Sequence, residues 1–138
     1  MKHSRILGKT ILLAAISLIS FTSCLSTQNE VTAETSDREI IQYAQTAYDK
    51  GRQKEAISYY EKLLMYYGQD MSIYVEGKYE IGHIYFKQKK YKEAAACFTE
   101  VISIYDSLPY GTIPATFKKL SQNDLQKIPA NKLTSSEN

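Results

Sequence analysis

The residues that most readily do chemistry are few in this chain. His83 is the one histidine beyond the N-terminal segment, and Cys24 and Cys97 are the only two cysteines. A catalytic triad or a metal site built on His83 needs a nucleophile, carboxylates or a second ligand converging on it, and no motif around His83 supplies them. We therefore expect no catalytic residues, no metal site and no cofactor. A small ligand-binding or enzymatic role for His83 is the alternative.

The composition is that of a single globular domain. The chain has 138 residues, of which 43% are hydrophobic and 23% are charged. Its first 23 residues contain three basic residues and no acidic one, so 14 basic and 15 acidic residues are left for the rest. A nearly neutral body does not favour nucleic acid as a partner.

The N-terminal segment has the order of a secretory signal. Basic residues precede an apolar run at residues 11–19, and small residues then lead to Cys24. The run is shorter than the roughly 20 residues that a membrane-spanning helix needs. Residues 21–24 resemble a bacterial lipobox, with Phe21 in place of the usual Leu. The resemblance implies that a signal peptide of residues 1–23 is removed and that Cys24 carries lipid such as palmitate.

Two alternatives to lipidation stay open, namely an uncleaved membrane anchor and ordinary secretion with Cys24 unmodified. Acyl chains on Cys24 would contribute about 0.8 kcal/mol for each buried methylene group, which is enough in total for stable anchoring. Residues 24–36 follow, and their polar, aperiodic sequence is poor in large apolar side chains. Such a segment buries too little surface to fold, so we expect a flexible tether there.

An internal repeat with a period of 38 residues runs through the rest of the chain. The shift preserves the size class of most apolar positions, which makes chance a weak explanation. Residues matched in this way include Ala44, Tyr48, Ala56, Tyr60 and Tyr67 with Gly82, Phe86, Ala94, Phe98 and Tyr105.

Apolar residues within each repeat recur at steps of three and four residues, which predicts helices rather than strands. We expect an all-α domain over residues 37–128 and a disordered tail over residues 129–138. Its fifth helix would start near Pro114 and turn Phe117 and Leu120 inward. The four earlier helices are predicted at residues 37–50, 53–67, 73–88 and 91–105.

Local signals agree with this division. Ser36 followed by Glu39 has the form of a capping box at the start of a helix, and Gly51 suits the left-handed residue that follows a helix end. Small residues occupy positions where the two helices of a pair must approach closely. These small residues are Ala44, Ala47 and Ala56 in the first repeat, and Gly82 and Ala94 in the second.

The segment from Ile81 to Ala94, followed by Phe98, resembles the tetratricopeptide repeat (TPR), with residues 43–60 a weaker match. The resemblance implies a right-handed α-solenoid of about two and a half helix hairpins. One departure is that Lys89 stands where the first repeat has Gly51, so this turn either avoids a positive φ or accepts a cost of about 1 kcal/mol.

The long connectors between the helix pairs resemble those of a subgroup of TPR lipoproteins in the bacterial envelope. This subgroup contains the assembly lipoprotein of the β-barrel assembly machinery and the coordinator associated with the Tol-Pal system. The resemblance implies a lipid-anchored scaffold on the periplasmic side of the outer membrane. Its partners would be proteins or extended peptides, possible subunits of an assembly complex among them, and a domain with two full repeats is also a candidate for self-association.

The same resemblance implies a partner-binding groove along the first helix of each pair. Aromatic side chains there would give contact area at a small entropic cost, although most of the 12 tyrosines fit core positions equally well. The residues predicted to line the groove are Arg38, Ile41, Gln45, Tyr48, Tyr79, His83, Phe86 and Lys87.

A basic run at residues 87–92 has two interpretations. It suits an acidic partner or lipid phosphate, and it equally suits a solvated turn between helices, which the short length of the run favours.

Overall fold

The computed structural model describes residues 29–134, which form six helices and, within this range, no strand. The predicted signal peptide of residues 1–23, Cys24, and residues 135–138 at the end of the predicted tail lie outside the described residues. The helices are α1 (Asp37–Asp49), α2 (Gln53–Tyr67), α3 (Met71–Lys87), α4 (Tyr91–Ser107), α5 (Thr116–Gln126) and α6 (Ala130–Thr134).

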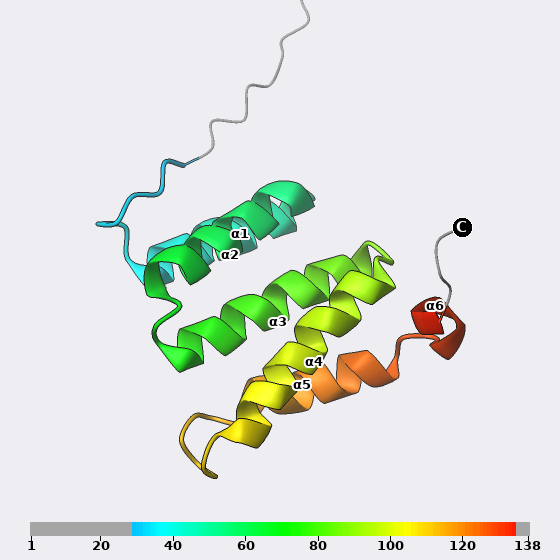
Figure 1. Ribbon diagram of the computed structural model, residues 1–138. Coiled ribbons are helices and arrows are strands. Elements are labelled where there is room, and N and C mark those ends of the chain that lie inside the picture. The colour runs from blue at the N-terminus through cyan, green and yellow to red at the C-terminus, as the bar shows by residue number, and fades with distance from the viewer. Residues whose placement is uncertain (1–28, 135–138) are drawn as a thin grey trace, which may run out of the picture.

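The helices are arranged as two stacked hairpins followed by a single helix (Figure 1). α1 packs on α2, α3 packs on α4, and α2 and α3 join the two pairs. α5 then lies against both α3 and α4, while α6 contacts α4. The predicted all-α, TPR-like solenoid is confirmed, because each hairpin contacts the next one along the chain.

The predicted helix boundaries are correct to within about two residues, as is usual for helix ends. The largest difference at a helix start is in α3, which begins at Met71 rather than at residue 73. The reason is Asp70, whose side chain accepts hydrogen bonds from the backbone N–H groups of Ser72 and Ile73. Ser36 caps α1 as predicted, since its Oγ accepts from the N–H group of Glu39.

Both turns within the hairpins contain a residue with a positive φ. Gly51 has φ of 73° and Lys89 has φ of 61°, so the second turn keeps the left-handed conformation without a glycine. A left-handed residue with a Cβ is unfavourable because the Cβ comes too close to the following carbonyl oxygen. Lys89 therefore carries a conformational cost that Gly51 does not.

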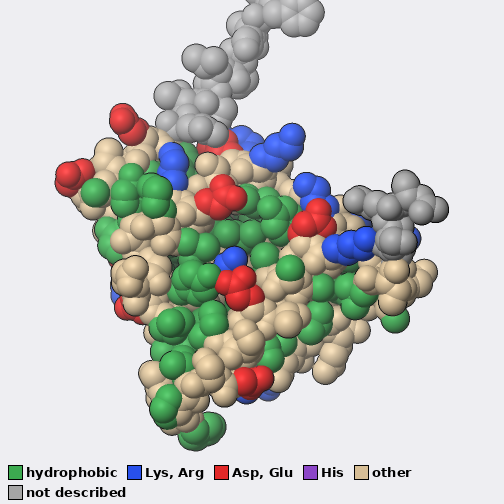
Figure 2. Space-filling view, in the orientation of Figure 1, with side chains coloured by type: hydrophobic (Ala, Val, Ile, Leu, Met, Phe, Trp, Pro, Cys, Tyr) green, Lys and Arg blue, Asp and Glu red, His purple; other side chains and the backbone are tan. Residues whose placement is uncertain are grey.

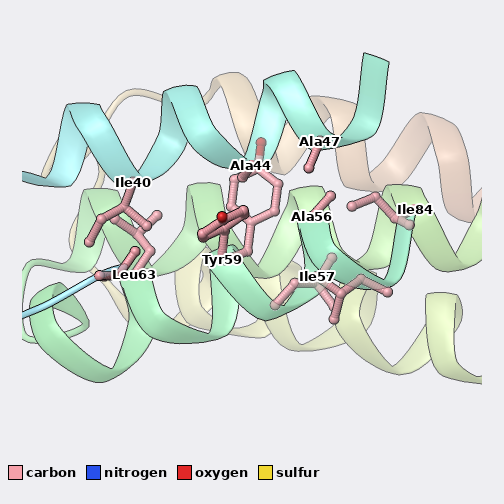
Figure 3. Packing of buried hydrophobic residues seen from close by; sticks show 11 residues of the cluster. Ile40, Ala44, Ala47, Ala56, Ile57, Tyr59, Leu63 and Ile84 are labelled. Carbon is pink, nitrogen blue, oxygen red and sulfur yellow. The ribbon is translucent and has the colours of Figure 1, made fainter. Parts of the chain in front are cut away.

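Two apolar clusters form the core. The first lies between α1, α2 and α3 and contains Ile40, Tyr59, Leu63 and Ile84 (Figure 3). The second lies between α3, α4 and α5, with Phe98 and Val101 at its centre. The small residues predicted at close helix contacts lie inside these clusters or beside them, and Ala44, Ala47, Ala56 and Ala94 are fully buried.

The prediction for α5 was half right. Phe117 packs into the second cluster, but Leu120 is exposed. The turn of α5 toward the core instead buries Ser121 and Asp124, and the buried residue Ile128 follows the helix. Leu120 corresponds to Gly82 in the 38-residue shift, and Gly82 packs against α4, the second helix of its own hairpin. Within residues 29–134 α5 has no such partner helix, because the short α6 contacts α4 instead.

Residues 29–36 belong to the segment predicted as a flexible tether, and in the structure they lie against α2. Val31 is buried in the first cluster, the hydroxyl of Tyr67 donates to the carbonyl oxygen of Thr35 over 2.7 Å, and the N–H of Asn29 donates to the Tyr59 hydroxyl over 2.7 Å. Two α2 tyrosines thus give this polar segment partners that its own composition does not reveal.

The start of the predicted tail also differs from expectation, because residues 130–134 form the short helix α6. Pro129 immediately precedes α6, where the backbone N–H that proline lacks is not needed for a helical hydrogen bond. All side chains of α6 are exposed or nearly so. None of the helices between residues 29 and 134 is long and apolar enough to cross a membrane.

The turn at Lys89 leads to a stability prediction. Lys89→Gly removes the contact between Cβ and backbone at positive φ, so we expect the free energy of unfolding to rise by about 0.5–1 kcal/mol. Urea denaturation followed by circular dichroism measures this change. Gln88→Gly in the same turn is the control, because Gln88 has φ of −77° and gains nothing from glycine. A loss of stability in both variants would show that the left-handed conformation costs nothing.

Candidate functional site

The eight predicted groove residues lie on α1 and α3, the first helices of the two hairpins. The structure exposes some of them and buries others. Arg38, Gln45 and Lys87 are exposed, Ile41, Tyr48, His83 and Phe86 are half-buried, and Tyr79 is buried with 7% of its surface accessible.

The α1 part of this face brings Gln45 and Tyr48 together beside a small cavity. The cavity has a volume of about 60 Å³, and Glu80 and Ile84 of α3 form its opposite wall. Two of the predicted residues therefore line a hollow between α1 and α3. Because Gln45 is exposed and Tyr48 is half-buried, this part of the face presents both a polar group and an aromatic ring to solvent.

The α3 part of the face is covered by α5. Asp124 of α5 is buried, and its Oδ2 accepts hydrogen bonds from the Tyr79 hydroxyl at 3.1 Å and from His83 Nδ1 at 2.9 Å. Its Oδ1 accepts from Lys127 Nζ at 2.7 Å. A single carboxylate thus joins two predicted groove residues to the helix that packs over them.

The hydrogen bonds to Asp124 decide its charge state. Burial acts to raise the pKa of Asp124, but its three hydrogen-bond donors outweigh burial and hold the pKa below its usual value. The carboxylate is therefore ionised at neutral pH. Because an ionised carboxylate can only accept hydrogen bonds, His83 Nδ1 must carry a proton and donate it.

The side chains of Tyr79 and Phe86 pack against other aromatic rings of the domain rather than projecting toward a partner. The ring of Tyr79 lies 5.6 Å from that of Phe117 and 5.9 Å from that of Phe98, as measured between ring centroids. Burial, together with the charge of Asp124, raises the pKa of Tyr79. Phe86 meets the ring of Tyr91 edge-on at 5.9 Å. Both side chains therefore join α3 to its neighbours.

Two carboxylates of α3, Glu76 and Glu80, lie on this face and were not among the residues predicted from the sequence. Burial raises the pKa of Glu76, and the charge of Asp37 adds to this effect. Burial also raises the pKa of Glu80, against a smaller opposing effect from His83. Glu76 and Glu80 are four residues apart and so share one side of α3, a spacing that was visible in the sequence.

Asp124 could not have been found in the same way. The 38-residue shift aligns it with Phe86, an aromatic core residue, so the repeat itself predicts an apolar side chain at this position. No signal within α5 marks Asp124 as buried, because its partners come from α3, 41 and 45 residues earlier in the chain.

Comparison with known families identifies both hairpins. Residues 40–70 and residues 75–107 each match the tetratricopeptide repeat, and these ranges cover most of α1 with α2 and of α3 with α4. The chain therefore contains two tetratricopeptide repeats. TPR proteins are typically non-enzymatic scaffolds, and the repeats imply a module for protein–protein interaction.

One relative of known sequence is a protein of Treponema pallidum (strain Nichols) whose description is "Uncharacterized protein". It is 26% identical over 108 residues, which make up 77% of this chain and 43% of that protein. The chain thus spans less than half of the length of this relative. No solved structure matches the chain.

The chemistry available on the TPR face is limited. His83 and Asp124 form a pair in which the carboxylate orients the imidazole, as in many acid–base catalysts. The hydrogen-bond partners of this pair are Tyr79 and Lys127, and neither is placed as an activated nucleophile. Within residues 29–134, no group of three or more His, Cys, Asp and Glu side chains is placed to bind a metal ion.

The Asp124 contacts lead to a prediction about stability and pH. Asp124→Asn removes the charge that three donors require, so we expect a loss of about 1–2 kcal/mol in the free energy of unfolding at pH 7. The wild-type pKa is lower in the folded than in the unfolded chain. The stabilisation is therefore present above the unfolded pKa of about 3.9 and lost as pH falls through the lower folded value.

Urea denaturation across this pH range tests the prediction. Asp106→Asn is a matched control, because Asp106 forms its ion pair with Lys118 at an exposed position, where such pairs contribute about 0–1 kcal/mol. An Asp124→Asn variant as stable as the control variant at pH 7 would mean that the carboxylate does not hold α5 in place.

Proposed function

We propose that this protein is a lipid-anchored scaffold of the bacterial cell envelope, held on the periplasmic side of the outer membrane. Its TPR domain binds a protein or an extended peptide during outer-membrane protein assembly or envelope biogenesis. The observation that carries the proposal is the pair of stacked repeats, whose first helices leave Gln45 and Tyr48 accessible beside the α1–α3 cavity.

The structure narrows the binding surface relative to the predicted groove. α5 covers Tyr79, so the partner contacts the part of the face that α5 leaves open. This open part of the face consists of Arg38, Gln45 and Tyr48 of α1, with the half-buried carboxylates Glu76 and Glu80 of α3 beside them. Burial raises the pKa values of both carboxylates, so a partner that offers a basic group or hydrogen-bond donors there would relieve an unfavourable environment.

The proposed anchor rests on the N-terminal sequence. Basic residues, a short apolar run and a cysteine after small residues follow one another in the order of a lipoprotein signal. Acyl chains on Cys24 would keep the domain at the membrane. This raises its effective concentration for a partner that is held at the same membrane.

A coordinating role between the Tol-Pal system and the cell wall is the second candidate. It rests on the same long connectors and the same proposed anchor, so the identity of the bound partner separates it from barrel assembly. We propose no enzymatic role, because the His83–Asp124 pair lacks an activated nucleophile within hydrogen-bond reach.

Site-directed photocrosslinking in intact envelopes tests the proposal. A crosslinking side chain at Gln45 should capture one envelope protein, whereas the same side chain at Met65, which is 66% exposed on α2, should not. Tyr48→Ala should reduce capture at Gln45 by about tenfold, as expected for the loss of one central aromatic contact. Circular dichroism checks that the helices of this variant are intact.

Equal capture at Gln45 and Met65, or capture that Tyr48→Ala leaves unchanged, would argue against a partner on the α1 part of the face. The anchor is tested separately with radiolabelled palmitate. The label should enter the wild-type chain and be absent from Cys24→Ala, and label retained in that variant would contradict lipidation at this cysteine.

A further inference from the structure

The two turns within the hairpins lie at the same edge of the domain, and both are rich in lysine. We call this the basic edge. Around it, seven basic residues face three acidic ones, which are Asp49, Glu55 and Glu93. In Figure 2, blue side chains gather along the upper right of the molecule, where Figure 1 shows the turns. The basic residues of this edge are Lys50, Arg52, Lys54, Lys87, Lys89, Lys90 and Lys92.

The lysines of the basic edge form no ion pair within the part of the chain that the structure describes. All six lysines are exposed, and the ion pairs of residues 29–134 involve other basic residues. Arg52 is paired with Glu55 at 3.2 Å, and Lys90 lies over the ring of Tyr85. A shallow hollow lined by residues 51–55, Gln88 and Lys90 connects the two turns into one surface.

The opposite ends of the same helices lack this excess of positive charge and contain several carboxylates. Asp37 and Glu39 lie at the start of α1, Asp70 precedes α3, and Asp106 lies near the end of α4. Basic residues accompany these carboxylates, because Arg38 lies between Asp37 and Glu39 and Lys118 pairs with Asp106. The connector end is therefore of mixed charge, whereas the turns within the hairpins carry an excess of lysine. A domain with this distribution turns its basic edge toward an anionic surface and its other edge away.

Lys89 gives a separate reason to regard the lysines as functional. It occupies a left-handed position with φ of 61°, where the equivalent residue in the first repeat is glycine. A sequence that only required a turn would gain stability from glycine there, as Gly51 shows. The chain instead keeps a lysine in an unfavourable conformation at the centre of the basic edge, and such residues point to function.

The place where the chain leaves the domain brings this edge close to the proposed anchor. Asn29 is bound to the hydroxyl of Tyr59, which is six residues from the start of α2 at the basic edge, or about 9 Å along the helix axis. Only residues 25–28 lie between Cys24 and Asn29, so even a fully extended chain spans at most about 18 Å from one to the other. Lipid on Cys24 would therefore keep the domain close enough to the bilayer for the basic edge to reach the headgroups.

We propose that the basic edge docks on anionic phospholipid headgroups and so fixes the orientation of the TPR domain on the membrane. This inference rests on the proposed lipid anchor. Lysines near an anionic surface add to the affinity of acyl chains, and an acyl group combined with a polybasic patch is one of the combinations that attach proteins stably to membranes. With the basic edge at the headgroups, the helices stand away from the bilayer and the α1–α3 face stays open to a partner.

The chemistry of the basic edge fits lipid headgroups better than an acidic protein. Six of its seven basic residues are lysines, which act as mobile point charges, and its one arginine is already paired with Glu55. Recognition of carboxylates in a protein partner favours the planar, bidentate arginine side chain. A diffuse layer of phosphate groups needs only charge density, which exposed lysines on two neighbouring turns provide.

Lysine labelling on vesicles tests this proposal with the full chain. The protein, purified from envelopes, is reconstituted in vesicles of phosphatidylcholine alone or of phosphatidylcholine with phosphatidylglycerol. A membrane-impermeant amine reagent and mass spectrometry then give the labelling rate of each lysine. We expect the lysines of the basic edge to react about fivefold more slowly on anionic vesicles, with high salt reversing the effect. Lys119, exposed on α5, should react equally on both.

Variants with matched charge changes sharpen the test. Lys89→Gly with Lys92→Gln removes two charges from the basic edge. Because glycine adopts the positive φ at position 89 more readily than lysine, we expect this variant to fold. This variant should lose most of the protection at Lys50 and Lys54. Lys118→Gln with Lys119→Gln removes two charges from the other end of the helices and should leave that protection unchanged.

The outcomes separate this inference from the proposed anchor. Equal labelling of the basic edge on neutral and anionic vesicles, with the protein attached to both, overturns the membrane docking and leaves the anchor intact. An acidic protein as the true partner would give that result. Protection on anionic vesicles that persists in Cys24→Ala supports the basic edge and shows that its docking does not depend on the anchor. Failure of the wild-type chain to float with either kind of vesicle overturns both.

Discussion

The close approach of the two helices in each hairpin is the constraint on which the rest of the structure depends. A Cβ atom on Gly82 would lie 2.8 Å from Cys97 Cβ and 2.9 Å from the ring of Phe98, both on α4. In the first hairpin, Ala44 and Ala56 are fully buried at the corresponding contact. Because both hairpins have this close spacing, they have the same shape and stack in the same orientation. As a result α1 and α3 lie on one face of the domain, and the turns within the two hairpins lie at one edge.

The stack of hairpins ends at α5, which covers part of the face that a partner could otherwise contact. A solenoid of two repeats would leave the second apolar cluster open, so Phe117 and Ile128 cover it. This cover places Asp124 beside Tyr79 and His83, where a buried carboxylate is tolerated only because its hydrogen bonds are complete. The surface left for a partner is therefore concentrated on the side of α1, while the charge of the turns faces elsewhere.

The sequence was sufficient for features that depend on local spacing. Helical periodicity, the Ser36 cap and the left-handed Gly51 are determined within a few residues, and the structure has all three. Features that depend on distant partners could not be predicted. Asp124 becomes buried because α3 supplies its donors, and Leu120 is exposed because, within residues 29–134, no second helix of a hairpin covers that side of α5. The predicted groove was placed by resemblance, which carried no information about what α5 covers.

A pair of glycine substitutions in α3 tests the helix spacing most directly. Alanine favours a helix over glycine by about 1 kcal/mol, so each substitution would stabilise α3 if space allowed. In Gly77→Ala the new Cβ meets the end of the flexible Leu64 side chain, which can move, and we predict unchanged or higher stability. In Gly82→Ala it meets Cys97 Cβ and the Phe98 ring, and we predict that the free energy of unfolding falls by about 1–3 kcal/mol. A Gly82→Ala chain as stable as wild type in urea denaturation would contradict the account.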